Sequence, residues 1–244
     1  MKQPAASNEW SSVTQAHGEF TIADITLGSG ETLPELRLHY TTLGAPSRDE
    51  VGTVRNAVLI LHGTGGSGKA FLRERFAGVL FGPGQLLDAR RYYIILPDGI
   101  GHGESSKPSD GQRASFPRYA YHDMVRAQFE LVTQGLGVDH LRLVMGTSMG
   151  GMHTWMWGEL YPDFVDALLP LASLPVQIAG RNRMMRRMVL DAIRTDPTWM
   201  GGEYEAQPRG LTSAIYTLLF MVSSPLKWRR VAPTLAEADQ LFDK

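Results

Sequence analysis

The sequence predicts an α/β protein with a mostly parallel sheet flanked by helices. Two continuous apolar runs, at residues 57–61 and 92–96, are typical of strands buried on both faces. A third strand-like run begins at Leu141 and leads directly into a helical pattern. Strands that alternate with helices favour a parallel sheet, because parallel neighbours need a long crossover connection.

An antiparallel hairpin is expected ahead of these strands. Apolar and polar residues alternate over residues 19–26 and 35–43, and Gly28 and Gly30 lie between them. Residues 1–18 are small and polar, so a loose arm is expected there. The core of the fold is therefore expected over residues 19–174.

One helix is expected over residues 121–135, before the third apolar strand. Met124, Ala127 and Leu131 recur at helical spacing on one side, with Gln128 beside them. A further short apolar run, at 165–171, follows the helix that begins near Met149.

The last part of the chain, residues 175–244, is predicted to be a helical cap. Helical patterns over 184–193, 211–222 and 235–242 are separated by prolines and glycines, and no strand-like run occurs among them. Ligands bind at the carboxyl ends of the strands in open α/β sheets, so the cap is expected to cover that edge. Its methionine and tryptophan side chains either pack the cap against itself or line an adaptable acyl pocket.

The composition excludes several classes of protein. The 244 residues, 43% hydrophobic and 20% charged, fit one globular domain with an inserted subdomain. A formal net charge of -1 argues against a nucleic-acid partner and against an anionic membrane. No apolar run approaches the roughly 20 residues of a membrane span. The absence of cysteine excludes disulfides and thiolate chemistry.

Cellular location and cofactors are weakly constrained by the sequence. Residues 1–12 lack the apolar core of a signal peptide, which leaves open the cytoplasm or a mature secreted or periplasmic form. No metal-ligand spacing occurs, and nothing in the sequence requires a cofactor.

A candidate nucleophile lies where the third strand meets its helix. Residues 146–150, Gly-Thr-Ser-Met-Gly, match the pattern G-x-S-x-G, in which a sharp turn exposes the Ser148 hydroxyl at the edge of a sheet. A side chain at Gly146 or Gly150 would collide with the neighbouring strand or helix. The helix that starts at Met149 directs its free N–H groups toward a carbonyl bound at Ser148. The motif predicts a nucleophile and one oxyanion donor.

A second oxyanion donor is expected from the loop after the first apolar strand. His62-Gly63-Thr64-Gly65-Gly66 follows that strand directly. In this arrangement the amide N–H of Thr64 acts together with that of Met149, while His62 and Gly63 support the loop. A flexible glycine loop without such a role is the alternative.

The same loop also matches most of a phosphate-binding pattern. Residues 63–70, GTGGSGKA, fit G-x-x-x-x-G-K-[ST] except at Ala70, which has no hydroxyl for magnesium. Asp98, after the second apolar strand, would imitate the acidic residue of such a protein. Nucleotide binding through Gly63 to Ala70 is therefore a second hypothesis, although it leaves Ser148 unexplained.

Together these motifs resemble the homoserine O-acetyltransferase-like group of α/β-hydrolase-fold proteins. The resemblance is carried by the HGTGG loop, by residues 116–128, and by GTSMGGMHTW followed by residues 159–163. Residues 191–211 of the expected cap also resemble that group. The similarity covers most of residues 20–225 and implies an α/β-hydrolase fold with acyl chemistry at Ser148.

Two positions depart from that group. Where the group usually places an arginine for the substrate carboxylate, this chain has Ile215, which cannot pair with an anion. Where the group has a glycine-serine-threonine loop, residues 101–105 are Gly-His-Gly-Glu-Ser and resemble an ordinary esterase. The resemblance therefore implies acyl chemistry and leaves homoserine unsupported as the acceptor.

The base and the acid of a serine triad have no clear candidates. The only histidine after Ser148 is His153, and its place five residues along the same helix directs it away from the serine hydroxyl. His62 and His102 lie on loops at the correct end of the sheet, where each is expected to order its own loop. Asp166 lies at the start of a strand, and the later aspartates belong to the expected cap.

We therefore expect the acid, the histidine and the carboxyl-terminal strands to lie outside this chain. The sequence ends inside the predicted helix at 235–242. A second polypeptide or a further segment of roughly 100 residues would complete the fold. A homo-oligomer is also left open.

With that complement, the expected function is hydrolysis or transfer of an acyl group from an ester or thioester, through an acyl-enzyme at Ser148. Hydrolysis is slightly favoured because of Ile215. A degenerate hydrolase fold that only binds its ligand is the non-enzymatic alternative.

Overall fold

The computed structural model describes residue 10 and residues 13–241, and the chain divides into two compact units. The first unit extends to Pro175, and the second begins at Val176. The first contains the sheet, whereas the described residues of the second form only helices and loops.

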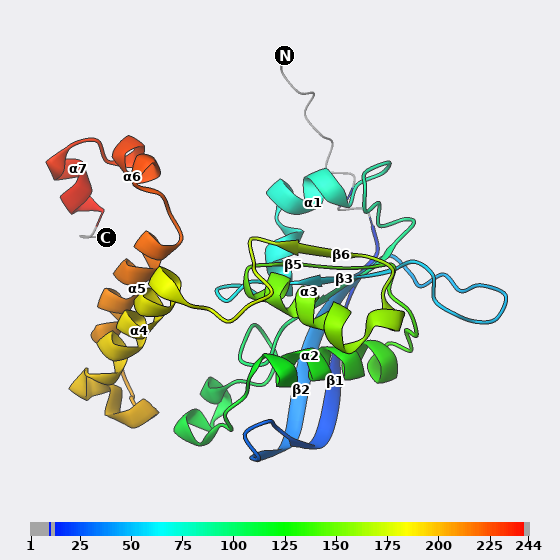
Figure 1. The fold of residues 1–244 in the computed structure, drawn as a ribbon, viewed down its shortest axis with the longest axis horizontal. Helices are drawn as coiled ribbons and strands as arrows, with labels where there is room; N and C mark the ends of the chain where they lie inside the picture. Colours follow the sequence, from blue (N-terminus) through cyan, green and yellow to red (C-terminus); the bar gives the residue numbers. More distant parts are fainter. Residues whose placement is uncertain (1–9, 11–12, 242–244) are drawn as a thin grey trace. The chain divides into compact units, whose positions relative to one another are not determined.

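A six-stranded mixed sheet forms the centre of the first unit (Figure 1). In space the strands follow the order β1-β2-β4-β3-β5-β6. The hairpin strands β1 and β2 pair antiparallel, β2 pairs antiparallel with β4, and the other neighbours pair in parallel. The strand bounds are β1 Gln15–Thr26, β2 Thr32–Leu43, β3 Ala57–Leu61, β4 Tyr93–Pro97, β5 Leu143–Thr147 and β6 Leu168–Leu171.

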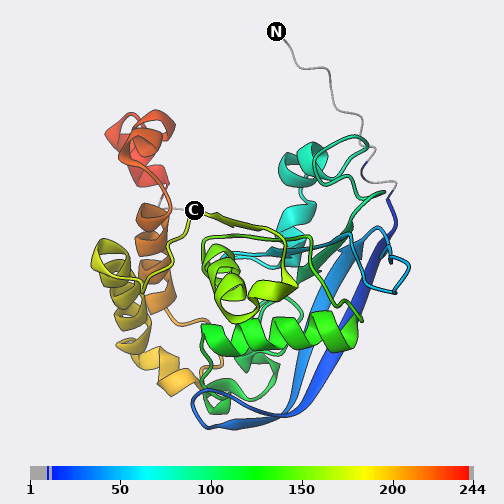
Figure 2. The ribbon, with the colours of Figure 1, turned by 45° about the vertical axis from the view of Figure 1, so that its right-hand side comes forward.

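Helices cover both faces of this sheet, as Figures 1 and 2 show. The short helix α1 (Glu74–Leu80) lies on one face, while α2 (Tyr121–Glu130) and α3 (Met149–Leu160) lie on the other. Each face has its own hydrophobic cluster, with Phe81 buried on the α1 side and Trp157 buried on the α3 side. The layered α/β architecture predicted from the sequence is confirmed.

Strand β3 has apolar side chains on both faces, as its continuous apolar run predicted. Val58 and Ile60 belong to the cluster on the α1 side, while Leu59 and Leu61 belong to a cluster on the other face. Each of the four is at most 2% exposed. Because β3 lies between β4 and β5, the loop that follows Leu61 emerges in the middle of the carboxyl edge of the sheet.

The hairpin begins earlier than predicted. Strand β1 starts at Gln15, which pairs with Leu43, so the prediction of a loose arm over 1–18 is wrong from Gln15 onward. Trp10 also packs against the cluster on the α1 side, and its Nε1–H donates to Glu74 at 2.8 Å. Pairing with β2 stabilises this first part of β1 although most of its side chains are exposed. The remaining residues of the arm, 1–9, 11 and 12, lie outside the described part of the chain.

The helix predicted over 121–135 is α-helical as far as Glu130 and continues as a π-helical turn, Leu131–Gly135. Its predicted apolar side, including Met124 and Gln128, is buried. Helix α1 was not predicted, since its seven residues include Gly78 and are too few to show a clear helical period.

Four helices make up most of the second unit, and α4 and α5 pack side by side. Pro208 and Ala214 are buried in this unit, whereas Phe220 is 58% exposed. Helix α6 was not predicted; Ser224 caps it and Pro225 starts it. The helix bounds are α4 Gly180–Arg194, α5 Gly210–Met221, α6 Pro225–Val231 and α7 Leu235–Gln240.

None of the helices in the described part of the chain combines the length and the apolar character needed to cross a bilayer. The role of this unit as a cap stays a prediction.

Candidate active site

Ser148 lies at the predicted turn between β5 and α3. Its backbone has φ 55° and ψ -112°, a conformation that costs a residue other than glycine roughly 1–3 kcal/mol. Two backbone hydrogen bonds hold the turn: Ser148 N–H donates to the Leu171 carbonyl oxygen at 2.9 Å, and Met152 N–H donates to the Ser148 carbonyl oxygen at 3.0 Å. The serine is thereby held at the carboxyl edge of the sheet and at the amino end of α3.

Gly146 and Gly150 leave no room for a side chain, which confirms the predicted collisions. A β-carbon at Gly146 would lie 2.2 Å from the carbonyl oxygen of Gly150. One at Gly150 would lie 2.0 Å from the carbonyl oxygen of Leu61. The first turn of α3 therefore approaches β5 and the end of β3 backbone to backbone.

The glycine loop after β3 lies against Ser148. A β-carbon at Gly63 would be 3.5 Å from the Cβ of Ser148 and 3.3 Å from the carbonyl oxygen of Thr147. This contact follows from the topology, because β3 and β5 are parallel neighbours whose carboxyl ends meet at the same edge. The structure therefore brings the two predicted halves of the site together.

The ring of His62 orients the peptide between Gly63 and Thr64. Its Nδ1 lies 2.9 Å from the Gly63 carbonyl oxygen, and its Nε2 accepts from Gly99 N–H at 2.9 Å. Because an amide N–H can only donate, Nε2 carries no proton and Nδ1–H is the donor to Gly63. Gly66 N–H donates to the same oxygen at 3.0 Å. In a trans peptide the Thr64 N–H points away from that oxygen, so these bonds fix its direction.

Burial lowers the pKa of His62, which favours the neutral ring that this hydrogen-bond pattern requires. Both of its nitrogens are engaged, so His62 is poorly placed to act as a general base. It supports the loop, as the sequence indicated, and it also links that loop to Gly99.

His102 makes the reciprocal link between the same two loops. Its Nδ1 lies 2.9 Å from the Ile100 carbonyl oxygen and its Nε2 lies 3.0 Å from the Thr64 carbonyl oxygen. The rings of His62 and His102 are 5.0 Å apart, centre to centre. His102 therefore orders its own turn, as expected, and also contacts the loop that carries Thr64.

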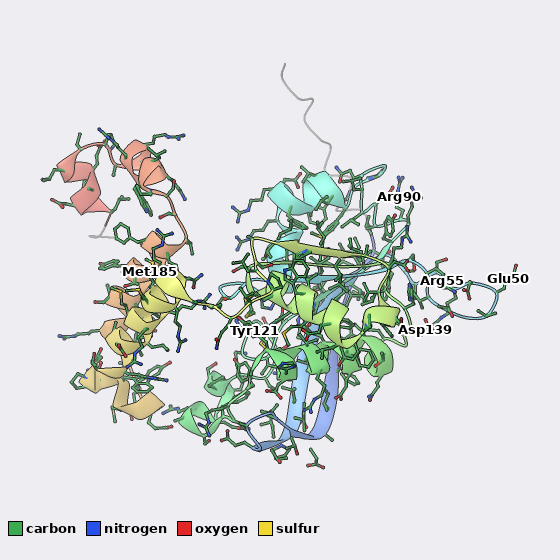
Figure 3. All side chains as sticks on the ribbon, in the orientation of Figure 1. Glu50, Arg55, Arg90, Tyr121, Asp139 and Met185 are labelled. Carbon is green, nitrogen blue, oxygen red and sulfur yellow. The ribbon has the colours of Figure 1, made fainter. Side chains whose placement is uncertain are left out.

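His153 is a buried core residue. Its Nδ1 lies 3.2 Å from the side-chain nitrogen of Gln128, whose oxygen accepts from Trp157 Nε1–H at 3.0 Å. A tryptophan N–H can only donate, so Gln128 directs its NH₂ group to His153 and the ring carries its proton on Nε2. That nitrogen has no partner among the described residues. Tyr121, labelled in Figure 3, meets the ring edge to face at 4.8 Å.

Burial lowers the pKa of His153 to about 3, with smaller contributions from His62 and His102. A ring so weakly basic and so deeply packed is unsuited to accept a proton from Ser148. The packing alternative given by the sequence is confirmed.

No histidine in the described part of the chain hydrogen-bonds to Ser148. Of the acids, Asp166 binds Arg142 at 2.9 Å and His140 at 2.8 Å, and these two partners lower its pKa. It therefore belongs to a surface ion-pair group. The described residues contain no group of three or more His, Asp or Glu side chains placed to hold a metal ion.

The geometry of residues 63–70 argues against phosphate binding. Gly68 N–H donates to Oδ1 of Asp98 at 2.7 Å, so a carboxylate already occupies this amide. Lys69 pairs with Glu104 on the surface at 3.1 Å. The loop leads into a five-residue 3-10 helix, Gly68–Leu72, which offers little helix dipole for an anion.

Asp98 is the buried group of this region that sequence reasoning did not assign to the site. It is 2% exposed, and its Oδ2 accepts from Glu104 N–H at 2.9 Å and lies 3.0 Å from Nδ1 of His39. The position of Asp98 in the sequence could have indicated a place near the site, because a charged residue directly after a buried parallel strand lies at the carboxyl edge of the sheet.

The sheet order, the strained serine turn and the adjoining glycine loop define an α/β-hydrolase architecture. A family model described as "alpha/beta hydrolase fold" matches residues 56–221, and the chain belongs to this family.

Comparison with individual proteins shows which members of the family this chain resembles. The chain is 36% identical to a homoserine O-acetyltransferase of Moorella thermoacetica over 224 residues, covering 83% of this chain and 57% of the relative. The solved acetyl esterase MekB is 30% identical, with a TM-score of 0.78 and coverage of 88% and 61%. The Bacillus anthracis homoserine O-acetyltransferase shares the fold, with a TM-score of 0.80, 24% identity and coverage of 94% and 69%.

These similarities confirm the predicted fold and the predicted resemblance. The chain spans 57% of the length of the Moorella relative and 61% of MekB.

Proposed function

We propose that the protein acts on an ester or thioester through an acyl-enzyme at Ser148. The observation that supports this most strongly is the positive φ of Ser148 beside the Gly63 loop. Strained backbone of this kind persists only where its surroundings hold it, and it is concentrated at active sites. Similarity to an acetyl esterase and to homoserine O-acetyltransferases also supports acyl chemistry.

In the proposed reaction, Oγ of Ser148 attacks the acyl carbon while a base takes the hydroxyl proton. The carbonyl oxygen becomes an oxyanion, which accepts hydrogen bonds from the amides of Met149 and Thr64. Collapse of this intermediate breaks the bond to the leaving alcohol or thiol, which receives the proton from the base. Water or a second alcohol then gives its proton to the base and attacks the acyl carbon, and the bond to Ser148 Oγ breaks as this oxygen takes the proton back from the base.

The base and the acid are proposed to come from a complementing polypeptide or segment that pairs with β6. This strand is the last of the sheet, and its outer edge has no strand partner among the described residues. Leu169 and Leu171 are 43% and 38% exposed, and Leu174 beyond them is 66% exposed. An uncovered apolar strand edge favours association with a further strand.

The position of β6 also suits this arrangement. Because Ser148 N–H donates to the carbonyl oxygen of Leu171, the end of β6 is bonded directly to the nucleophile turn. Residues that follow a neighbouring strand would emerge at the same edge of the sheet.

Hydrolysis is proposed over transfer to an acceptor alcohol. The homoserine O-acetyltransferase-like group that the chain resembles usually has an arginine for the substrate carboxylate where this chain has Ile215 of α5, which carries no charge. Partitioning of the acyl-enzyme between water and added alcohols distinguishes the two reactions. Product dominated by the free acid at millimolar alcohol supports hydrolysis, whereas dominant ester product supports transfer.

The proposal is tested with a fluorophosphonate probe on the native protein, together with denaturing mass spectrometry of the same sample. We expect the probe mass on Ser148, no labelling of Ser148→Ala, and the complement either as a second polypeptide beside the 27.0 kDa chain or as added mass on a longer chain. A lone 27.0 kDa species that turns over esters with Ser148→Ala unaffected would contradict both the nucleophile and the complement.

A binding protein is the second candidate function. It is favoured by one observation, namely that no histidine of the described residues hydrogen-bonds to Ser148. Probe labelling of Ser148 in the native sample argues against it, and the absence of labelling with intact ligand binding supports it.

A further inference from the structure

Asp98 connects the two loops that surround the candidate oxyanion hole. Its Oδ1 accepts from Gly68 N–H at 2.7 Å, directly after the loop that carries Thr64. Its Oδ2 accepts from Glu104 N–H at 2.9 Å, in the loop that carries His102. One carboxylate therefore anchors both loops at their bases.

The second loop is folded around this carboxylate. A β-carbon at Gly103, where φ is 52°, would lie 2.1 Å from Oδ2 of Asp98. The hydroxyl of Ser105 donates to the Asp98 carbonyl oxygen at 2.8 Å. This close packing holds the turn in the conformation that places Nε2 of His102 3.0 Å from the Thr64 carbonyl oxygen.

The hairpin provides a hydrogen-bond partner for the buried carboxylate of Asp98. His39 lies on β2, and its Nδ1 is 3.0 Å from Oδ2 of Asp98. The backbone N–H of Asp98 donates to the His39 carbonyl oxygen at 2.8 Å. Burying a carboxylate is costly unless donors surround it, and here two amides and one imidazole provide them.

We infer that Asp98, held by His39, is a positioning residue for the oxyanion hole. It acts through the two loops and touches no substrate. The inference rests on the proposed function, because the loops matter to chemistry only if Ser148 forms an acyl-enzyme. Replacing the carboxylate leaves at least one amide without an acceptor, because a carboxamide accepts through only one of its two terminal atoms. The loop that carries Thr64 is then held less firmly at Gly68 or at the neighbouring loop, and the direction of the Thr64 amide depends on the remaining bonds to the Gly63 carbonyl oxygen.

Asp88 provides a matched control. It is also 2% exposed, and it accepts from the backbone amides of Gly84 and Arg90 and from the Arg90 guanidinium. It lies in the loop between α1 and β4, and Arg90 is labelled in Figure 3. Asp88→Asn therefore disturbs a buried carboxylate of similar kind outside the two loops.

The first experiment measures hydrogen–deuterium exchange by mass spectrometry on the native protein. Asp98→Asn is expected to speed exchange of residues 62–68 and 99–105 by at least tenfold, whereas Asp88→Asn leaves both segments unchanged. Unchanged exchange of these segments in Asp98→Asn overturns the inference, and this result does not depend on any activity.

The second experiment measures the rate at which a fluorophosphonate labels Ser148. A misdirected oxyanion donor is expected to slow labelling by about 10-fold to 100-fold in Asp98→Asn, with Asp88→Asn close to the wild type. Equal rates in Asp98→Asn and the wild type overturn the inference. If the wild type itself is not labelled, the proposed function fails, while exchange still decides whether Asp98 holds the loops.

A milder pair of variants covers the case in which Asp98→Asn does not fold. His39→Leu removes the imidazole donor and leaves the carboxylate with its two backbone amides, so slower labelling of the folded protein is expected. His39→Asn restores a side-chain N–H near the position of Nδ1 and is expected to recover most of the rate. Identical labelling in His39→Leu and the wild type contradicts the assigned role of His39.

Discussion

Gly150 contacts Leu61 backbone to backbone, and a β-carbon on Gly150 would stand 2.0 Å from the Leu61 carbonyl oxygen. Helix α3, which follows Ser148, therefore packs directly on the end of the central strand β3.

Gly150→Ala is expected to destabilise the protein by about 3 kcal/mol or more, because backbone must move to relieve the collision. Urea unfolding followed by fluorescence measures the change. Gly65→Ala is the control, since a β-carbon there has no atom within 4 Å, and it should change stability little. Equal midpoints for the two variants would falsify the tight contact.

Ser148→Gly is expected to raise the free energy of unfolding by about 1 kcal/mol relative to Ser148→Ala. The reason is the φ of 55° at this position, which glycine adopts without strain. Both variants lose probe labelling, so the comparison separates backbone strain from chemistry. Thermal unfolding of the two variants side by side provides the measurement, and a less stable glycine variant would count against strain at the turn.

The stability of the protein is expected to fall as the pH is lowered from about 6.5 toward 3, partly through His153. Its pKa is lowered to about 3 in the folded state, so below the ordinary value of 6.5 the unfolded chain binds a proton that the folded chain excludes. The loss from this residue is up to about 1.4 kcal/mol per pH unit.

His153→Gln keeps an acceptor for Gln128 and removes the titration. Its free energy of unfolding should depend less steeply on pH between 6 and 4 than that of the wild type. His122→Gln, at an exposed position on α2, is the control for replacing a histidine outside the core. Parallel curves for His153→Gln and the wild type would show that His153 does not contribute.

Asp123→Asn is expected to cost about 1 kcal/mol, because one of the two backbone amides that donate to this buried carboxylate loses its acceptor. Asp123 is 4% exposed and accepts from Gly28 N–H at 2.7 Å and from Ala120 N–H at 2.9 Å. It thereby joins the start of α2 to the hairpin turn. Chemical denaturation compares the variant with Asp163→Asn, an exposed position where little change is expected. No difference between the two would argue against this link.

The buried strands were predictable because their signal is local. A continuous apolar run identified β3 with its observed bounds, and the glycines around Ser148 identified the sharp turn between β5 and α3. The start of β1 was harder to predict from the sequence, because pairing with β2 holds it in place while its side chains are largely exposed.

The polar network of the site was not predictable from spacing. Asp98 finds its partners at Gly68, Glu104 and His39, which lie on three different segments of the chain. Such partners become visible only once the sheet order places β2, β4 and the loop after β3 beside one another. The pairing of Gln128 with His153 was hidden for the same reason, since it joins two helices.

The order of the strands in the sheet also determines how long one strand waits for its neighbour during synthesis. Val58 pairs with Leu143, so the residue opposite the central strand is made 85 positions later. At translation rates of roughly 5–20 residues per second, β3 waits about 4 to 17 s for β5. During that interval the apolar side chains of β3 are only partly buried. A chaperone that binds exposed apolar segments is most useful in this period.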